Sequence, residues 1–257
     1  MKSIKELIKD ADDFRKNNNF DKAIEIYSYL WNEKRNECDK NVGWRFAYCY
    51  RKTEKPDDAL KVIKEVYKLT DKDKVVNSEY SRILYDKFLK VEVINDEQNF
   101  LKVADCITKL CQQENTVYCI YTHSIFKVLK FYKSKSLFNE NAFLDWTSKL
   151  NPHLLSTLCN SQPDNLGITR EYASKKEEYY MYRTKALFRK KLYQECKSLC
   201  IEALKQIEKL HYDNEIWFRR RQLLSEYNLA EDKNKFIKEY KEILIKKNEW
   251  YYAVWTC

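Results

Sequence analysis

The sequence predicts an all-α fold, a right-handed α-solenoid of about six antiparallel helix pairs. Apolar residues recur at three- and four-residue spacing along nearly the whole chain, which is the period of an α-helix. Only 2 of the 257 residues are glycine and 3 are proline. The tight turns of a β-sandwich and the glycine-rich phosphate loop of a nucleotide-binding fold are therefore excluded. No stretch alternates strictly between apolar and polar residues, so we expect no strands.

Short polar residues and prolines indicate where helices begin. Asn41, Asn95, Asn115 and Asp213 can accept hydrogen bonds from free backbone N–H groups. Pro56 and Pro152 suit the first turn, where a missing N–H costs nothing. The predicted helices span residues 2–16, 20–35, 41–53, 56–69, 74–93, 97–113, 115–134, 139–150, 152–158, 171–190, 192–210, 214–228 and 233–247.

The helices occur in pairs, and residues 11–30 carry the clearest repeat. Ala11 and Phe14 lie late in the first helix of this pair, whereas Phe20 opens the second helix and Ala23 follows it. This segment resembles a tetratricopeptide repeat (TPR), a unit of about 34 residues in which two antiparallel helices stack on their neighbours. Residues with corresponding roles here and in two further copies are Tyr27 and Leu30; Ala47, Tyr50, Ala59, Ile63 and Val66; and Thr184, Leu187, Tyr193, Cys196, Cys200 and Ala203.

This pattern predicts three segments. Residues 1–158 form N-terminal TPR-like repeats, and residues 171–257 form C-terminal ones. Residues 159–170 between them contain Pro163 and Gly167 and lack periodicity, which predicts a loop or hinge. The last ten residues, N-E-W-Y-Y-A-V-W-T-C, are typical of the first helix of another pair, so we expect the C-terminal repeats to be truncated.

Charge and cysteine content restrict the compartment and the partner. The chain carries 48 basic and 39 acidic residues, a net charge of +9, and the excess is largest after residue 160. Such a field attracts acidic peptides or polyanions. The nine cysteines include no C-x-x-C pair, and the N-terminus lacks the apolar stretch of a signal peptide. We expect a cytoplasmic protein with reduced thiols and no membrane span.

The sequence carries no recognisable motif for catalysis or metal binding. None of His123, His153 and His211 lies in an H-E-x-x-H motif. Cys196 and Cys200 occupy small-residue positions of the repeat, which favours burial over zinc ligation. We therefore expect no enzymatic activity, no cofactor and no bound metal.

The resemblance implies a concave groove lined by the first helix of each pair, and aromatic and basic residues alternate along that face. Aromatic rings supply contact area, and arginine pairs with carboxylates through two hydrogen bonds. The residues expected to bind a partner are Trp44, Tyr48, Arg51, Tyr85, Phe88, Lys185 and Arg221. The other residues of this face are Lys5, Ile8, Asp12, Arg15, Tyr132, Lys135, Met181, Phe188 and Phe218.

A basic ridge is a second candidate surface, because residues 181–191 contain five basic and no acidic residues. Its expected members are Arg183, Arg189, Lys190, Lys191, Arg219 and Arg220. The main hypothesis is a non-catalytic scaffold or adaptor that binds a protein or peptide, with an acidic one favoured. The alternative is a helical-repeat module that binds single-stranded RNA or DNA, since stacking on aromatic rings and phosphate contacts suit that ligand.

Overall fold

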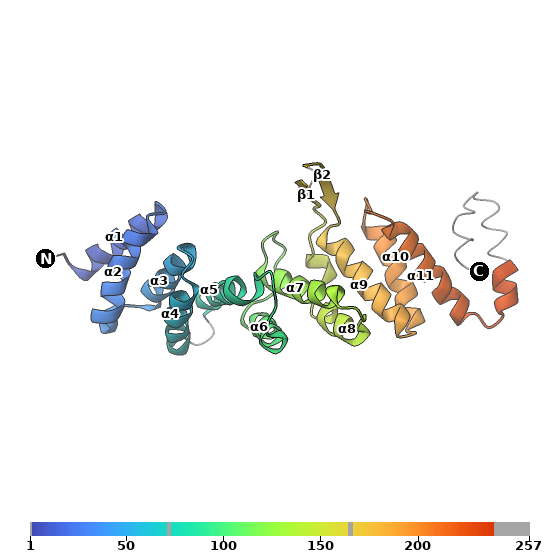
Figure 1. Ribbon diagram of the computed structural model, residues 1–257, viewed down its shortest axis with the longest axis horizontal. Helices are drawn as coiled ribbons and strands as arrows, with labels where there is room; N and C mark the ends of the chain where they lie inside the picture. The colour runs from blue at the N-terminus through green and yellow to red at the C-terminus, as the bar shows by residue number, and fades with distance from the viewer. Residues whose placement is uncertain (1, 71–72, 164–166, 239–257) are drawn as a thin grey trace. The chain divides into compact units, whose positions relative to one another are not determined.

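A computed structural model describes residues 2–70, 73–163 and 167–238 (Figure 1). The chain divides into two compact units, unit 1 (residues 1–114 and 118–128) and unit 2 (residues 115–117 and 129–257). The segment predicted as a hinge, residues 159–170, lies inside unit 2, and its role as a hinge stays a prediction. The predicted truncation at the C-terminus lies outside the described residues, as does the end of the helix predicted at residues 233–247.

Unit 1 consists of consecutive helices, each of which packs on the next from α1 to α5, and α5 packs on α6. Ser3 starts the first helix with a capping box, in which its side chain accepts from the Glu6 backbone and Glu6 accepts from the Ser3 backbone. The elements are α1 (Ile4–Lys16), α2 (Phe20–Glu33), the 3-10 helix η1 (Arg35–Glu37), α3 (Lys40–Lys52), α4 (Pro56–Leu69), α5 (Lys74–Leu84), the π-helix η2 (Tyr85–Leu89), α6 (Glu97–Leu110) and the first part of α7 (Ile120–Ser134).

Small side chains allow the helices of unit 1 to cross closely. Ala11, Ala23, Ala47 and Ala59 are each 0% exposed, as the repeat pattern predicts. Gly43 in α3 marks the closest approach: a methyl group at this position would lie 2.5 Å from the Trp31 ring and closer still to Val66. The contact joins α3 to α2 and α4, so these three helices depend on a residue without a side chain.

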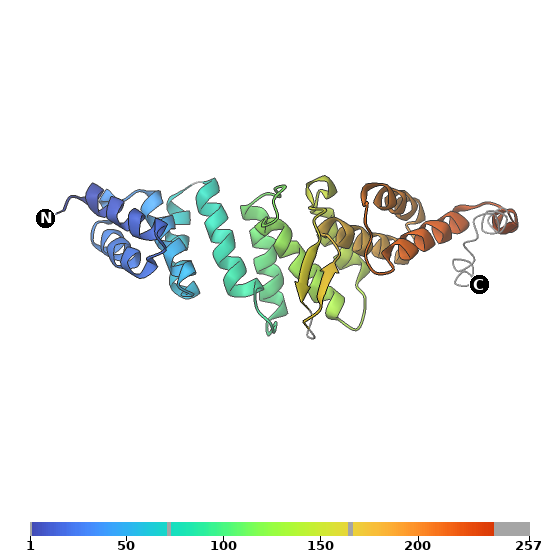
Figure 2. The same cartoon turned by 90° about the horizontal axis from the view of Figure 1, so that it is seen from above.

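Unit 2 contains a bundle of helices and a β-hairpin. Helix α8 packs on α9, α9 on α10, and α11 on both α9 and α10. The two strands pair antiparallel, with Pro163 opposite Thr169 (Figure 2). The elements after α7 are α8 (Glu140–Ser148), the 3-10 helix η3 (Pro152–Leu154), β1 (Asn160–Pro163), β2 (Thr169–Tyr172), α9 (Lys175–Arg189), α10 (Tyr193–Gln206) and α11 (Asn214–Leu229).

The structure confirms the all-α helical-repeat class within each unit and corrects several local predictions. The expectation of no strands is wrong, because residues 160–163 and 169–172 form the hairpin. The helix predicted at 152–158 is a single 3-10 turn, and the one predicted at 171–190 begins only at Lys175. The helix predicted from residue 115 begins at Ile120. The handedness and curvature of the complete array stay predictions.

No helix within the described ranges combines the length and the apolar composition that crossing a lipid bilayer requires.

We expect Gly43→Ala to destabilise unit 1 even though alanine favours helices. Overpacking costs about 1–3 kcal/mol, and the gain in helix propensity is about 1 kcal/mol, so the expected net loss is up to about 2 kcal/mol. Urea denaturation measures it. The double variant Gly43→Ala/Val66→Ala, compared with Val66→Ala alone, is the control for the contact with Val66, because it removes those methyl groups and leaves the contact with the Trp31 ring. A rise in the denaturation midpoint of Gly43→Ala would contradict the close packing.

Candidate binding site

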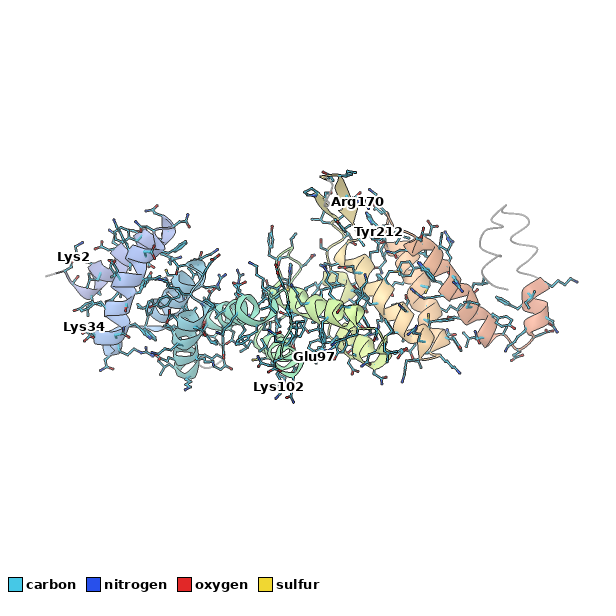
Figure 3. The ribbon with its side chains drawn as sticks, viewed as in Figure 1. Lys2, Lys34, Glu97, Lys102, Arg170 and Tyr212 are labelled. Atoms are coloured by element: carbon cyan, nitrogen blue, oxygen red, sulfur yellow. The ribbon has the colours of Figure 1, made fainter. Side chains whose placement is uncertain are left out.

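Unit 2 contains a pocket of about 930 Å³ that is lined by the end of α7 and the loop after it, the end of β2, helix α9 and the loop before α11. Four residues of the predicted groove face, Tyr132, Lys135, Met181 and Lys185, line this pocket. Tyr212 is another lining residue, and it lies near the strand residue Arg170 (Figure 3). The predicted groove face therefore supplied two residues from the end of α7 and its loop and two from α9, and the remaining lining comes from these same segments, the end of β2 and the loop before α11.

The pocket is strongly basic. Its cationic lining residues are Lys130, Lys133, Lys135, Lys175, Lys185 and Arg189, whereas Glu178 is its single carboxylate. That carboxylate already binds Lys175 at 2.5 Å. Arg189 pairs at 3.3 Å with Glu140, which does not line the pocket. Within the described part of the chain, Lys130, Lys133 and Lys185 form no ion pair, so the pocket holds positive charge that an anion could neutralise.

Lys185 lies at the centre of this charge. Partial burial lowers the pKa of Lys185, and the positive charges of Arg189, Arg221 and Lys133 lower it further. Burial and like charges both disfavour the ammonium form. A bound carboxylate would reverse both effects, because it would replace lost hydration and offset the neighbouring charges.

The Phe138 ring organises two of the pocket cations. It stacks on Phe143 with ring centroids 4.3 Å apart and an interplanar angle of 9°. The ammonium of Lys185 lies 4.5 Å from the Phe138 centroid and the guanidinium of Arg189 lies 4.9 Å from it. Cation–π attraction thus holds both charged groups beside one rigid ring, which reduces the entropy that a ligand would lose in ordering them.

Arg221 lies behind the pocket wall and not on it. The residue is 8% exposed, and burial lowers the pKa of its guanidinium. Its Nη1 donates to Thr184 Oγ1 at 3.0 Å and contacts the sulfur of Met181 at 3.7 Å. Met181 lines the pocket, so the guanidinium of Arg221 lies behind the Met181 side chain and adds to the positive potential of the pocket. The prediction that it presents a free guanidinium to a partner is corrected accordingly.

In unit 1, Trp44 and Tyr48 lie together, as the groove prediction requires. Both line a shallow pocket of about 400 Å³, together with Arg15. The Arg15 guanidinium lies 6.0 Å from the Trp44 ring centroid and 5.9 Å from that of Tyr48. Tyr85 and Phe88 line neither this pocket nor the pocket of unit 2. Their part in binding stays a prediction.

Arg51 is used internally, which corrects its prediction as a free partner-binding arginine. Its Nε donates to Glu79 Oε1 at 2.7 Å, and its Nη1 donates to Asp86 at 3.1 Å. Glu79 is buried, so the pair joins α3 to α5 and to the π-helix η2. The spacing along α3 placed Arg51 correctly beside Tyr48, but it could not reveal carboxylates brought from two later elements.

Several residues of the predicted basic ridge have side-chain partners within unit 2. Arg183 donates to Thr147 Oγ1 at 3.1 Å, and Arg219 binds Glu215 at 2.8 Å. The Arg220 guanidinium lies 5.5 Å from the Trp217 ring. Arg189 belongs to the pocket lining. Lys190 and Lys191 are exposed after the last turns of α9, and whether they bind a partner stays a prediction.

Much of the pocket lining was not predicted from the sequence. The end of α7 and its loop contribute Lys130, Lys133 and Phe138. The last residue of β2, Tyr172, and the first residue of α9, Lys175, also line the pocket. One signal was available: residues 130–135, K-F-Y-K-S-K, contain three lysines and no acidic residue.

Cys196 and Cys200 are core residues, as predicted, and both are fully buried. The Cys196 thiol donates to the Thr184 carbonyl oxygen at 3.4 Å.

Comparisons with known proteins bear on the fold. Neither models of protein families nor curated proteins match this chain. Among solved structures, one similar chain is the C-terminal part of a TPR repeat-containing protein from Cytophaga hutchinsonii, at 19% identity and a TM-score of 0.41, covering 97% of this chain and 88% of that one. The TPR-like repeats of a putative kinesin light chain from Podospora anserina are similar at 9% identity and a TM-score of 0.31, with 95% and 96% covered.

A third similar structure is that of Naa15/Naa10 bound to HypK-THB, with 13% identity and a TM-score of 0.36; 94% of this chain matches 36% of that one. The helix pairs described above carry fully buried small residues at the repeat positions. The chain has a TPR-like helical-repeat fold. At this level of similarity, the TPR-like neighbours give no information on what the chain binds.

We expect Arg51→Ala to destabilise the TPR-like unit 1 by about 3–5 kcal/mol, because it leaves the buried Glu79 carboxylate without its partner. Thermal or urea denaturation measures the loss. Lys109→Ala is the matched control: it also removes one cation of unit 1, but from an exposed pair with Asp105, which contributes little to stability because water screens it. Equal stability of the two variants would show that the Arg51–Glu79 pair is not structural.

Proposed function

We propose that this chain is a non-catalytic scaffold that binds an acidic segment of a partner protein in the pocket of unit 2. The observation that supports the proposal is the charge of the pocket, where six cationic residues surround one carboxylate that is already paired. Glutamate and aspartate side chains of a peptide would form charge-assisted hydrogen bonds with the lysines.

The shape and the apolar part of the lining support a peptide ligand. A volume of about 930 Å³ suits a few side chains, because pockets for compact ligands measure about 300–1,000 Å³. Met181, Leu137 and Phe138 supply apolar surface beside the cations. We expect the preferred segment to combine carboxylates with one or two large apolar side chains.

Two aromatic residues of the pocket offer little ring face on which a base could stack. Phe138 stacks against Phe143 with the cations of Lys185 and Arg189 over its ring, and Tyr182 is buried. Tyr172 and Tyr212 are exposed lining residues, so the experiment below also measures the affinity for a single-stranded oligonucleotide.

We expect the variant Lys133→Ala/Lys185→Ala to bind an acidic peptide at least tenfold more weakly. A charged hydrogen bond contributes about 1.5–3 kcal/mol, and about 1.4 kcal/mol corresponds to a factor of ten in affinity. The probe is a fluorescein-labelled peptide of glutamate, leucine and phenylalanine, and fluorescence anisotropy with the full chain gives the Kd. The same peptide with glutamine in place of glutamate should bind weakly to both proteins.

Lys205→Ala/Lys238→Ala is the matched control, because it removes the same charge from exposed positions of unit 2 that line neither the pocket nor the predicted ridge. Equal losses in both double variants would mean that net charge alone attracts the peptide, and the proposal would fail. A labelled single-stranded oligonucleotide that binds more tightly than the peptide, with a salt slope near −0.7 per phosphate contacted, would favour the nucleic-acid alternative instead.

A further inference from the structure

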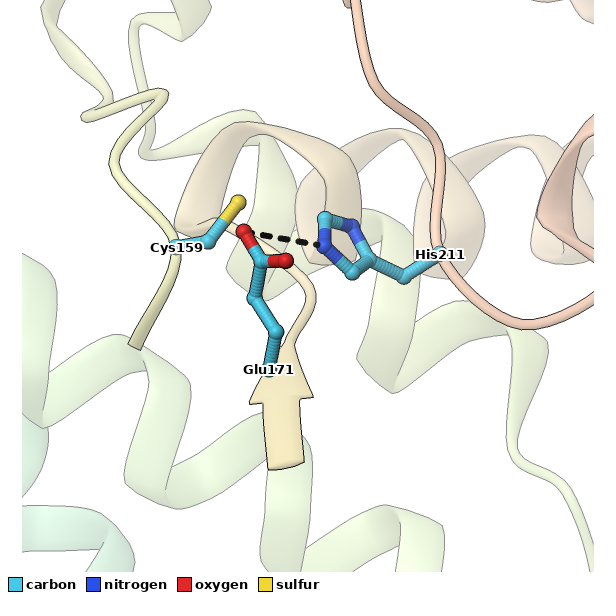
Figure 4. A group of neighbouring side chains, drawn as sticks. All are labelled: Cys159, Glu171 and His211. Atoms are coloured by element: carbon cyan, nitrogen blue, oxygen red, sulfur yellow. Dashed lines mark ion pairs between the residues drawn. The ribbon is translucent and has the colours of Figure 1, made fainter. Parts of the chain in front are cut away.

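Three metal-ligating side chains from separate segments of unit 2 meet beside the β-hairpin (Figure 4). Cys159 directly precedes β1, Glu171 lies in β2, and His211 lies in the loop between α10 and α11. The sulfur, one carboxylate oxygen and one ring nitrogen all lie within 4.8 Å of one another. Residues so far apart in the sequence share no motif spacing, so only the fold reveals the cluster.

The ring of His211 has a nitrogen that points into this cluster. Its Nδ1 lies 2.8 Å from Glu177 Oε2, and since a carboxylate accepts, Nδ1 is the donor in this contact and Nε2 is the ring nitrogen that faces the cluster. His211 is 7% exposed, and within the described residues its buried Nε2 has no hydrogen-bond partner. The nearest carboxylate oxygen, Glu171 Oε1, is 3.6 Å away, which is too far for a hydrogen bond.

Glu177 fixes this orientation from the core. It is fully buried, and its Oε1 accepts from the backbone N–H of His211 at 2.7 Å and from Asn214 Nδ2 at 2.6 Å. A carboxylate that holds one ring nitrogen while the other faces an open position is the usual support for a metal-binding histidine. Glu177 is therefore a positioning residue and not a ligand.

Glu171 lies between Lys209 and the other two side chains of the cluster. Lys209 pairs with its Oε2, whereas Oε1 is the atom nearest to His211. The carboxylate also shares a hydrogen bond with the Cys159 thiol, and an ion between the three donors would take the place of that thiol proton. It would give the buried imidazole nitrogen the partner that it lacks.

We propose that Cys159, Glu171 and His211 bind one divalent metal ion, and that zinc is the ion the donors suit best. Thiolate and imidazole together favour zinc, and three protein ligands leave a fourth tetrahedral position for water or a ligand. This assignment goes beyond the proposed peptide binding and does not depend on it. It replaces the sequence-based expectation that no residue of this chain binds metal.

The test is a titration of the reduced full-length protein with Co²⁺, which reports thiolate ligation through a charge-transfer absorption. We expect saturation at one equivalent and loss of the absorption when Zn²⁺ is added. Cys159→Ser should abolish the absorption, and Glu171→Gln should weaken binding at least tenfold. Glu177→Gln should weaken it about 10–100-fold, the usual effect of removing a support of the ligating histidine.

A footprint with iodoacetamide supplies the internal control. Zn²⁺ should slow alkylation of Cys159, whereas Cys38, Cys106 and Cys111, which are exposed to an intermediate degree, should react at unchanged rates. Circular dichroism verifies that each variant is folded. Absence of the thiolate absorption at saturating Co²⁺, or an unchanged absorption in folded Cys159→Ser, would overturn the proposal.

Discussion

A single helix pair cannot bury both of its faces, so every pair in this chain depends on close contact with its neighbours. That contact requires small side chains where the helices cross. Gly43 is the extreme case, because the ring of Trp31 and the methyl groups of Val66 occupy the space that a Cβ would need. Because the helices cross so closely, the large side chains between the crossing points, such as those of Tyr27 and Ile63, are fully buried.

The same dependence explains which parts of the fold were predictable. The positions of small residues repeat in the sequence, and the repeat specified the helix pairs and the burial of Ala23, Ala59 and Cys196. The hairpin was not predictable from alternation, because β2, T-R-E-Y, is exposed along its whole length and therefore shows no apolar periodicity. Two predicted caps were displaced by one or two positions, since Asp39 and Asp96, rather than Asn41 and Asn95, supply the caps.

The candidate site was predictable only where helical spacing assigns a face, along α9 and at the end of α7. Lys185 and Met181 are one turn apart on α9, so helical spacing placed them on the same face. Lys133 and Tyr172 enter the pocket from a helix end and a strand end, and no local pattern relates them. Arg51 shows the opposite problem: its face was correctly assigned, but its partners Glu79 and Asp86 come from later elements. The spacing of residues along a helix predicts which face a side chain lies on, whereas its ion-pair partners depend on the tertiary structure.

Arg221 has a thermodynamic consequence for unit 2. Its buried guanidinium bonds to a hydroxyl and lies near a thioether, and it adds to the repulsion at Lys185. The folded unit therefore carries an electrostatic self-energy that the unfolded chain, with its charges in water, does not carry. Any anion held in the pocket lowers that energy only in the folded state. Occupancy and folding are thus linked equilibria, and a ligand present at 100 times its Kd would raise the stability of unit 2 by about 2.7 kcal/mol.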